Sequence, residues 1–174
     1  MSTPTRPQPP GGRPPQGARG SPRTEGPAGT QPSSVVSELI QRFNNCRKLS
    51  ELNPQTEDFI RKSEELAQSR DMGRLNPTQL RRVFHEFRTI VKDYRRATAM
   101  RDAQFRLVML RPKLAYAAGR GVMPAHFYKL ICAALEKVRD ADDIEFLDRF
   151  LTAFLAYFKY HTAVSSGGRQ GGAQ

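Results

Sequence analysis

The sequence predicts an all-α protein, a compact bundle of about six helices that follows a disordered tail rich in proline, glycine and arginine. Apolar residues recur at the three- and four-residue spacing of a helix throughout 33–164. Residues that favour helix starts, such as serine, asparagine, aspartate and proline, precede these segments. No segment has the pattern of a strand.

The two ends of the chain differ in composition from its middle. Residues 1–32 contain nine prolines and six glycines and almost nothing apolar. Such a segment buries too little surface to offset its conformational entropy, so we expect a disordered basic tail. A short disordered glycine-rich tail is expected over 165–174. One helical bundle over 33–164 then forms the folded part.

The first two helices are predicted from their start signals and their periodicity. A helix over 33–50 has a serine cap and an apolar face. Asn53 as the cap and Pro54 as the first residue open a second helix, with Gly73 as its terminator. Its mostly polar composition predicts a position on the outside.

The third and fourth helices are predicted to form the middle of the chain. Asn76 and Pro77 open the third, and Gln79 is spaced for a capping box. The fourth, over 98–118, is apolar on most sides and is expected to be central. Pro112 removes one backbone hydrogen bond there, which predicts a kink or a split.

Two further helices complete the predicted bundle. Pro124 opens the fifth. A sixth, capped by Asp140, Asp142 or Asp143, runs to about His161 and has the widest apolar face in the chain.

The charge of the chain points to a polyanionic partner. Lys and Arg number 28 against 17 acidic residues, a net charge of +11. This excess favours nucleic acid or an anionic membrane, with a basic surface kept for solubility as the alternative. No apolar run approaches the ~18 residues of a membrane span, and no secretory signal is expected. Cys46 and Cys132 are too far apart in the sequence for a zinc motif and are expected to be reduced core residues in a cytosolic protein.

The sequence contains no recognisable catalytic motif, neither a phosphate loop nor a nucleophile elbow. His85, His126 and His161 fall on three different predicted helices, and Asp142 and Asp143 are placed for capping. We therefore expect no enzyme activity, no metal and no cofactor.

Cations are segregated along one edge of the third predicted helix. At 100° per residue, Glu86 and Asp93 lie on the other side, where Arg82 is placed to pair with Glu86. Four unpaired cations spanning about 21 Å would suit a row of phosphates, and a solvated basic face is the alternative. These cations are Arg81, Arg88, Lys92 and Arg95.

A second basic group flanks the fourth predicted helix and includes Arg111, Lys113 and Arg120. Gly119 and Gly121 on either side of Arg120 would let backbone amides and the guanidinium approach one phosphate together. Most phenylalanines fall on core faces, which favours contact with a nucleic-acid backbone over base reading.

Three stretches resemble a known family. They are Leu-Asn-Pro-Thr-Gln-Leu-Arg-Arg-Val-Phe at 75–84, Leu-Arg-Pro-Lys-Leu-Ala-Tyr-Ala-Ala-Gly-Arg at 110–120, and Phe-Leu-Thr-Ala-Phe-Leu-Ala-Tyr-Phe-Lys-Tyr at 150–160. Their order and spacing resemble the small subunit of type III-A CRISPR–Cas interference complexes, the Csm complexes, over about 35–161. Pro77 and Pro112 depart from the family pattern.

The resemblance implies a non-catalytic protein of the prokaryotic cytoplasm that acts in antiviral defence. Several copies would stack as an inner filament along the guide RNA–target RNA duplex, beside the backbone and large subunits that cut RNA and DNA. Binding would be independent of sequence, because base pairing carries the specificity. The residues that match the family's basic positions are Arg81, Lys113, Arg120 and Lys159. The predicted RNA-binding set adds Arg88, Lys92 and Arg95 from the helix-edge argument.

We weigh three alternatives, the first in the same class of protein as this interpretation and the other two in different classes. The chain could be the small subunit of the related type III-B complex. It could also be a helical adaptor that docks acidic proteins without an RNA role, or an RNA-cutting enzyme.

Overall fold

The protein is described here from a computed structural model, which covers residues 31–97 and 100–167. No strand occurs in these two ranges, so the all-α prediction is confirmed. The predicted tails lie largely outside them. The elements are α1 (Ser34–Asn45), η1 (Leu49–Gln55), α2 (Thr56–Gln68), η2 (Arg70–Met72), α3 (Pro77–Ala97), α4 (Met100–Gly119), α5 (Ala125–Leu135) and α6 (Ala141–Gly167), where η marks a 3₁₀ helix.

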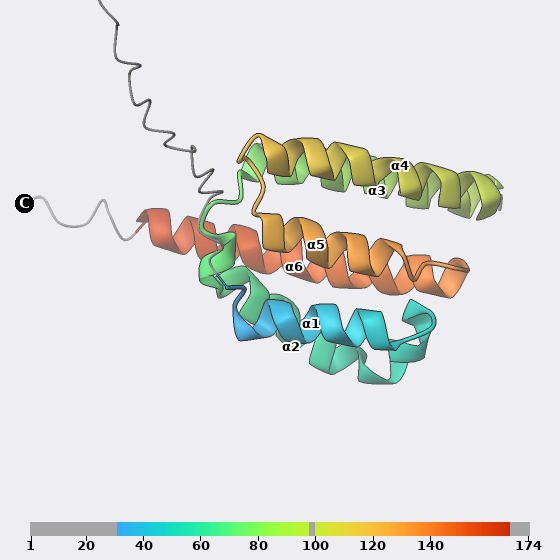
Figure 1. Cartoon of the computed structure of the whole chain (residues 1–174), viewed down its shortest axis with the longest axis horizontal. Helices are drawn as coiled ribbons and strands as arrows, with labels where there is room; N and C mark the ends of the chain where they lie inside the picture. Colours follow the sequence, from blue (N-terminus) through green and yellow to red (C-terminus); the bar gives the residue numbers. More distant parts are fainter. Residues whose placement is uncertain (1–30, 98–99, 168–174) are drawn as a thin grey trace, which may run out of the picture. The chain divides into compact units, whose positions relative to one another are not determined.

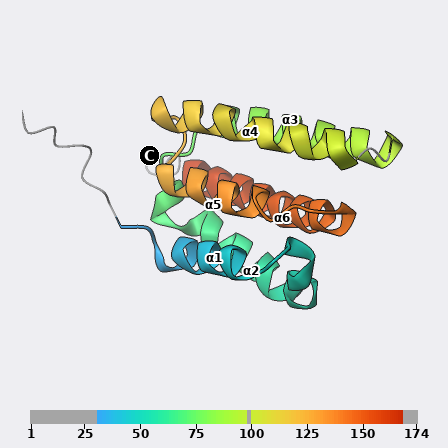
Figure 2. The same ribbon diagram turned by 45° about the vertical axis from the view of Figure 1, so that its right-hand side comes forward.

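The six α-helices form two layers of three (Figure 1). One layer contains α4, α5 and α1, and the other contains α3, α6 and α2. Helices α3 and α4 pack on each other at one edge, and α1 and α2 at the other. The view turned by 45° shows the same arrangement (Figure 2). Within the covered residues, no helix is both long and apolar enough to span a membrane.

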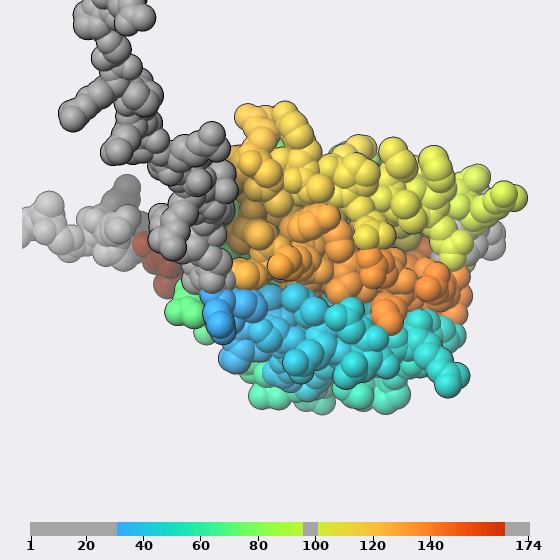
Figure 3. Space-filling view, in the orientation of Figure 1, coloured from blue at the N-terminus to red at the C-terminus, as the bar shows by residue number. Residues whose placement is uncertain are grey.

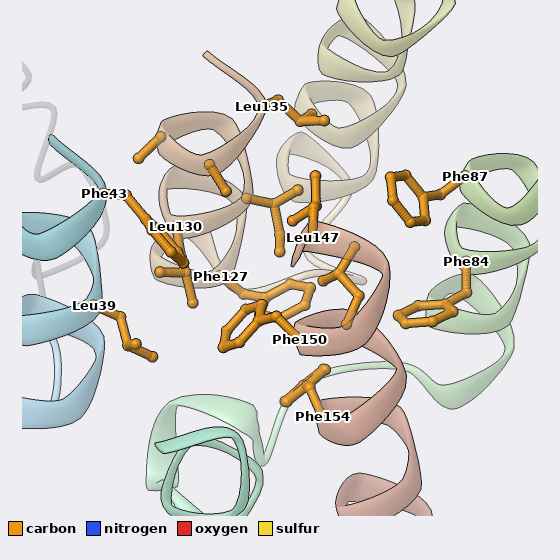
Figure 4. Packing of buried hydrophobic residues seen from close by; sticks show 14 of the residues in the cluster. Leu39, Phe43, Phe84, Phe87, Phe127, Leu130, Leu135, Leu147, Phe150 and Phe154 are labelled. Carbon is orange, nitrogen blue, oxygen red and sulfur yellow. The ribbon is translucent and has the colours of Figure 1, made fainter. Parts of the chain in front are cut away.

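Helix α6 occupies the middle of its layer and carries the aromatic centre of the core. The ring of Phe154 lies 5.0 Å from that of Phe127 on α5. The ring of Phe150 packs edge-on against Phe43 of α1 at 5.6 Å. Figure 4 shows these side chains between helices that are far apart in the sequence. The wide apolar face predicted for this helix therefore reflects burial on several sides.

Helix α4 lies at an edge of the bundle, so its predicted central position is wrong. Only one of its faces is buried, whereas Phe105 and Tyr116 are each 67% exposed. The helix also continues unbroken from Met100 to Gly119, so Pro112 does not split it. Pro112 is exposed, and its ring therefore displaces no core side chain.

The first two helices are shorter than predicted. Helix α1 ends at Asn45, and the chain then extends before η1 begins. Pro54 lies inside η1, and α2 starts only at Thr56, whose hydroxyl donates to the carbonyl oxygen of Asn53 at 2.6 Å. Helix α2 ends at Gln68 and η2 follows, so Gly73 terminates the 3₁₀ turn instead.

The predicted cap residues of α3 and α6 are confirmed, but the capping box of α3 is not formed, because the amide of Asn76 donates to the carbonyl oxygen of Val122 at 3.1 Å. The side chain of Asn76 accepts from the amides of Thr78 at 2.9 Å and Gln79 at 3.3 Å. Asp140 Oδ1 accepts from the amide of Asp143 at 3.1 Å, and Asp143 Oδ2 accepts in return from the amide of Asp140 at 3.1 Å. Reciprocal bonds of this kind satisfy the unpaired donors at a helix start.

We expect Phe154→Ala to lower the free energy of unfolding by about 3–5 kcal/mol, because the ring is fully buried and its loss leaves a cavity. Urea denaturation followed by circular dichroism measures this change. The control is Phe105→Ala on exposed α4, for which the change should stay within about 0.5 kcal/mol. Equal costs for the two variants would contradict the placement of α6 at the centre.

Acid should destabilise the fold through carboxylates near α1 and α2. Hydrogen bonds from Arg61 and Arg42 lower the pKa of Asp58, and a hydrogen bond from Lys62 lowers the pKa of Glu38. Groups whose pKa is lower in the folded state stabilise the protein above their unfolded pKa, about 4, and this contribution disappears as pH falls through the folded value.

The melting temperature should therefore decrease as the pH drops below about 4. Between pH 5 and 8 these groups should cause no decrease in the melting temperature. Thermal unfolding at a series of pH values measures it. Asp58→Asn should lower the melting temperature at pH 7 and make the acid decline shallower. If the melting temperature of this variant decreases equally steeply in acid, Asp58 does not contribute to the acid destabilisation.

Candidate nucleic-acid interface

The predicted basic residues of α3 lie along the edge that faces α6. The buried face of α3, which borders this edge, carries Leu80, Phe84 and Phe87. The side chains of Arg81, Arg88, Lys92 and Arg95 are all exposed. The capped start and apolar face of α3 thus hold this row of cations at the surface.

Two of the four cations are paired with α6, so the prediction of four unpaired groups is wrong. Arg88 Nη1 donates to Thr152 Oγ1 at 3.0 Å and lies 3.6 Å from Asp148 Oδ1. Arg95 Nη2 lies 3.2 Å from Glu145 Oε1 and 3.4 Å from Asp148 Oδ2. Both side chains remain about half exposed, and the acids of α6 hold their guanidinium groups.

Asp148 is the acid on which this pairing centres. Its side chain is 12% exposed, and its Oδ1 accepts no hydrogen bond from the described residues. A buried carboxylate is costly unless cations compensate its charge, so Arg88 and Arg95 have a structural role. Sequence analysis did not single out Asp148, although an acid inside the apolar face of the sixth helix was a visible signal.

Arg81, Lys92 and Lys159 form no ion pair within the described part of the chain. Arg81 and Lys159 come from α3 and α6 and flank an open hollow of about 290 Å³ with an apolar floor that includes Leu80 and Phe158. Lys92 lies further along α3 beside a second hollow, which His85 also lines. We name Arg81, Lys92 and Lys159 the free cations.

Lys113 and Arg120 lie in a different groove, between α3 and α4. Lys113 forms an ion pair with Glu86, the acid predicted to pair with Arg82. The guanidinium of Arg120 lies over the ring of Tyr116, 5.6 Å from its centre. Around α3, Glu86 is displaced by about 140° from Arg81, so this groove and the free cations open on different sides.

The turn after α4 leaves only the Arg120 side chain available for a phosphate. Its amide donates to the carbonyl of Tyr116 at 3.1 Å, and the amide of Gly121 donates to that of Ala118 at 3.0 Å. Gly121 has a φ of 70°, which closes the turn. The backbone amides expected to approach a phosphate are therefore already engaged.

The remaining residues that sequence analysis singled out are core cysteines, histidines on separate helices and an arginine in an internal ion pair. Cys46 and Cys132 are buried and unbridged, and burial raises the pKa of the Cys46 thiol. His85, His126 and His161 lie on α3, α5 and α6. Arg111 forms an ion pair with Glu136 at 2.6 Å. Within 31–97 and 100–167, no three potential metal ligands come together.

Comparison with protein-family models assigns the chain to a family. The model of the Csm2 type III-A family matches residues 53–163. The chain belongs to this family. The Csm2 match runs from η1 to α6 and contains all seven predicted RNA-binding residues. It identifies the chain as a small subunit of the type III-A Csm complex, in place of the type III-B alternative. No curated protein and no solved structure gives a significant match.

Because Asp148 pairs with only two of the cations on this edge of α3, replacing different cations there should change the free energy of unfolding by different amounts. Arg88→Ala and Arg95→Ala together should lower the free energy of unfolding by about 0.5–3 kcal/mol more than the sum of the single changes, because only the double variant leaves Asp148 without a cation. Urea denaturation at pH 7 measures this coupling. Arg81→Ala and Lys92→Ala are the controls and should combine additively, so equal coupling in both pairs would contradict this role of Asp148.

Proposed function

We propose that this Csm2 protein is a non-catalytic subunit that binds the backbone of guide and target RNA independently of sequence. The observation that carries the proposal is the set of free cations, Arg81, Lys92 and Lys159, exposed together along the α3–α6 edge. Phosphate contacts of this kind fix position and carry no sequence information. Specificity then comes from pairing between guide and target.

The seven predicted contacts divide into three groups under this proposal. The free cations make the first contacts, since an RNA phosphate displaces no internal partner from them. Arg88 and Arg95 present the outward half of each guanidinium while Asp148 and Glu145 hold the inward half. Lys113 and Arg120 belong to the α3–α4 groove and contact a separate stretch of RNA or a neighbouring subunit.

In the assembled complex, several copies would stack as an inner filament along the guide–target duplex. The other partners would be the backbone and large subunits of the Csm complex, in the cytoplasm of a prokaryote and in antiviral defence. Family membership supports this placement. We assign the chain no catalytic residue.

Purification of the tagged protein from its host tests the assignment to an RNA-guided complex. We expect repeat-derived guide RNAs and several Csm subunits to co-purify. Recovery of the protein with mixed cellular RNA and none of these subunits would contradict the assignment.

The dependence of RNA affinity on salt separates phosphate binding from the adaptor alternative. A chain that neutralises phosphates releases counterions, so its affinity falls steeply as salt rises. Replacing Arg81, Lys92 and Lys159 together by Ala should weaken RNA binding equally for unrelated sequences. It should also reduce the slope of log K against log salt by about 0.7–0.9 for each cation removed. Fluorescence anisotropy with two RNAs of different sequence measures both quantities.

Lys129→Ala is the matched control, because Lys129 is an exposed cation of α5 with no ion pair in the described residues. It should leave the affinity and the slope nearly unchanged. A flat salt dependence of the parent protein would favour the adaptor, which binds acidic proteins.

A further inference from the structure

Two hollows join across the C-terminal part of α6. The first is the hollow of about 290 Å³ between Arg81 and Lys159, and the second, of about 920 Å³, lies between α6 and residues 67–75. Three residues line both hollows, which therefore adjoin, and these are Pro77, Phe158 and Thr162. We name the two hollows together the α6 groove.

The α6 groove belongs to the layer of α2, α3 and α6. Helices α1, α4 and α5 form the face shown in Figure 3, where the end of α6, in red, emerges at the margin. The groove is lined from the other layer and from the segment that connects α2 to α3. It is therefore separate from the α3–α4 groove that contains Lys113 and Arg120.

The floor of the α6 groove is apolar. Leu80 and Phe158 line the first hollow and are at most 7% exposed. Met72 and Leu75 line the second and are at most 4% exposed. Ala163 is exposed at the first hollow, where its small side chain leaves room for a ligand. An apolar side chain that enters such a hollow loses contact with water, so the groove suits a ligand with large apolar side chains.

The rim of the α6 groove is positively charged. Arg81, Lys159 and Arg70 are exposed, and none of them forms an ion pair with a described residue. No Asp or Glu is among the described residues that line either hollow. Unpaired positive charge thus borders apolar surface, which suits an anionic ligand.

Two acids lie near the α6 groove without lining it. Asp71 is buried, and its Oδ2 accepts from the amide of Ser33 at 2.7 Å. Glu64 Oε1 lies 3.8 Å from Nε2 of His161, which lines the second hollow. Both carboxylates are engaged within the chain and leave the three cations of the rim to a ligand.

The chemistry of the α6 groove favours a protein segment over nucleic acid. Proteins bind unpaired nucleobases by stacking them on exposed aromatic rings. Among the described residues that line the first hollow, Phe158 has the only aromatic ring, and it is 7% exposed, so the floor offers no stacking face. Phosphates alone would contact the rim and leave the apolar floor in water. Acidic side chains beside large apolar ones would match both the rim and the floor.

The ends of this chain do not have that composition. Residues 1–32 contain four Arg against a single Glu, and residues 168–174 contain Arg169 and no acid. Either end would bring positive charge to a positive rim. The ligand that fits the groove therefore comes from another protein.

We propose that the α6 groove binds an extended, acidic segment of a partner protein. A side chain the size of leucine or phenylalanine enters the first hollow, and carboxylates of the segment contact Arg81, Lys159 and Arg70. Binding of the segment does not require RNA. Arg81 and Lys159 also belong to the free cations, so the segment and an RNA backbone would compete for them, whereas Lys92 lies outside the groove.

Selection from a phage-displayed library of random peptides, on the full chain freed of RNA by nuclease, tests the class of ligand. We expect the enriched peptides to combine Asp or Glu with Leu, Phe or Met and to carry a net negative charge. The strongest of them, synthesised with a fluorescent label, is the probe for the measurements below. Enrichment of basic peptides, or of no peptide, would overturn the proposal.

Filling the first hollow tests where the probe binds. Ala163→Trp places a large side chain there without a change of charge and should weaken the probe about tenfold or more, as measured by fluorescence anisotropy. Ala156→Trp is the matched control, because Ala156 is exposed on the same face of α6, about two turns earlier, and lines neither hollow. Equal effects of the two changes would overturn the proposal. Circular dichroism verifies that both variants fold.

Reversal of charge tests the contacts at the rim. Arg81→Glu and Lys159→Glu should each weaken the probe several-fold, because carboxylates of the peptide then meet like charge. A second probe, with Lys in place of each acid, should bind these variants better than it binds the parent protein. Lys92→Glu is the control outside the groove and should affect neither probe. An equal loss in Lys92→Glu would show that net charge alone governs binding and would overturn the proposal.

Measurement with an RNA oligonucleotide separates the two classes of ligand. The oligonucleotide should bind Ala163→Trp as well as it binds the parent protein, because phosphates do not enter an apolar hollow. If Ala163→Trp weakens the oligonucleotide as much as the peptide, the α6 groove is an RNA site and the proposal is overturned. If the parent protein binds the peptide and no RNA, the proposed RNA function fails while the peptide site stands.

Discussion

Burial of the aromatic face of α6 is the constraint on which the other helices of the bundle depend. Phe146, Phe150 and Phe154 are each at most 2% exposed, and they contact rings from α1, α2 and α5. Burial of one such side chain contributes about 1.5–3 kcal/mol, so a continuous row of them outweighs most local preferences. The start of α6 is fixed as well, because Asp143 Oδ1 accepts from the amide of Ser50 in η1 at 2.6 Å.

The same helix decides which cations of α3 are available to a ligand. With α6 packed beside α3, Asp148 and Glu145 come under the basic edge and hold Arg88 and Arg95. About three turns further towards the C-terminal end of α6, Lys159 joins Arg81 beside an apolar hollow instead. One helix thus supplies acids to the second half of this edge, where only Lys92 stays free, and a further cation to its start.

Helix α4 shows where periodicity stops being informative. Its apolar residues cover most of its circumference, and sequence analysis took this to mean burial on most sides. In the structure, Leu107, Leu110 and Leu114 face the bundle, while Phe105, Met109 and Tyr116 face outward. Periodicity shows that a helix has apolar residues on several sides. It does not show which of these sides the rest of the bundle covers.

The sequence by itself determined the helical class, the caps of α3 and α6, the segregation of cations from acids along α3, and the family. The helical class, the caps and the row of cations depend on spacing within single helices, which the sequence reveals directly, and the family depends on the order of three stretches along the chain. Only the tertiary structure decided that α6 is central, that Asp148 holds Arg88 and Arg95, and that Lys113 takes Glu86 in place of Arg82. Each of these pairs residues from different helices, and their distance depends on how the apolar faces pack.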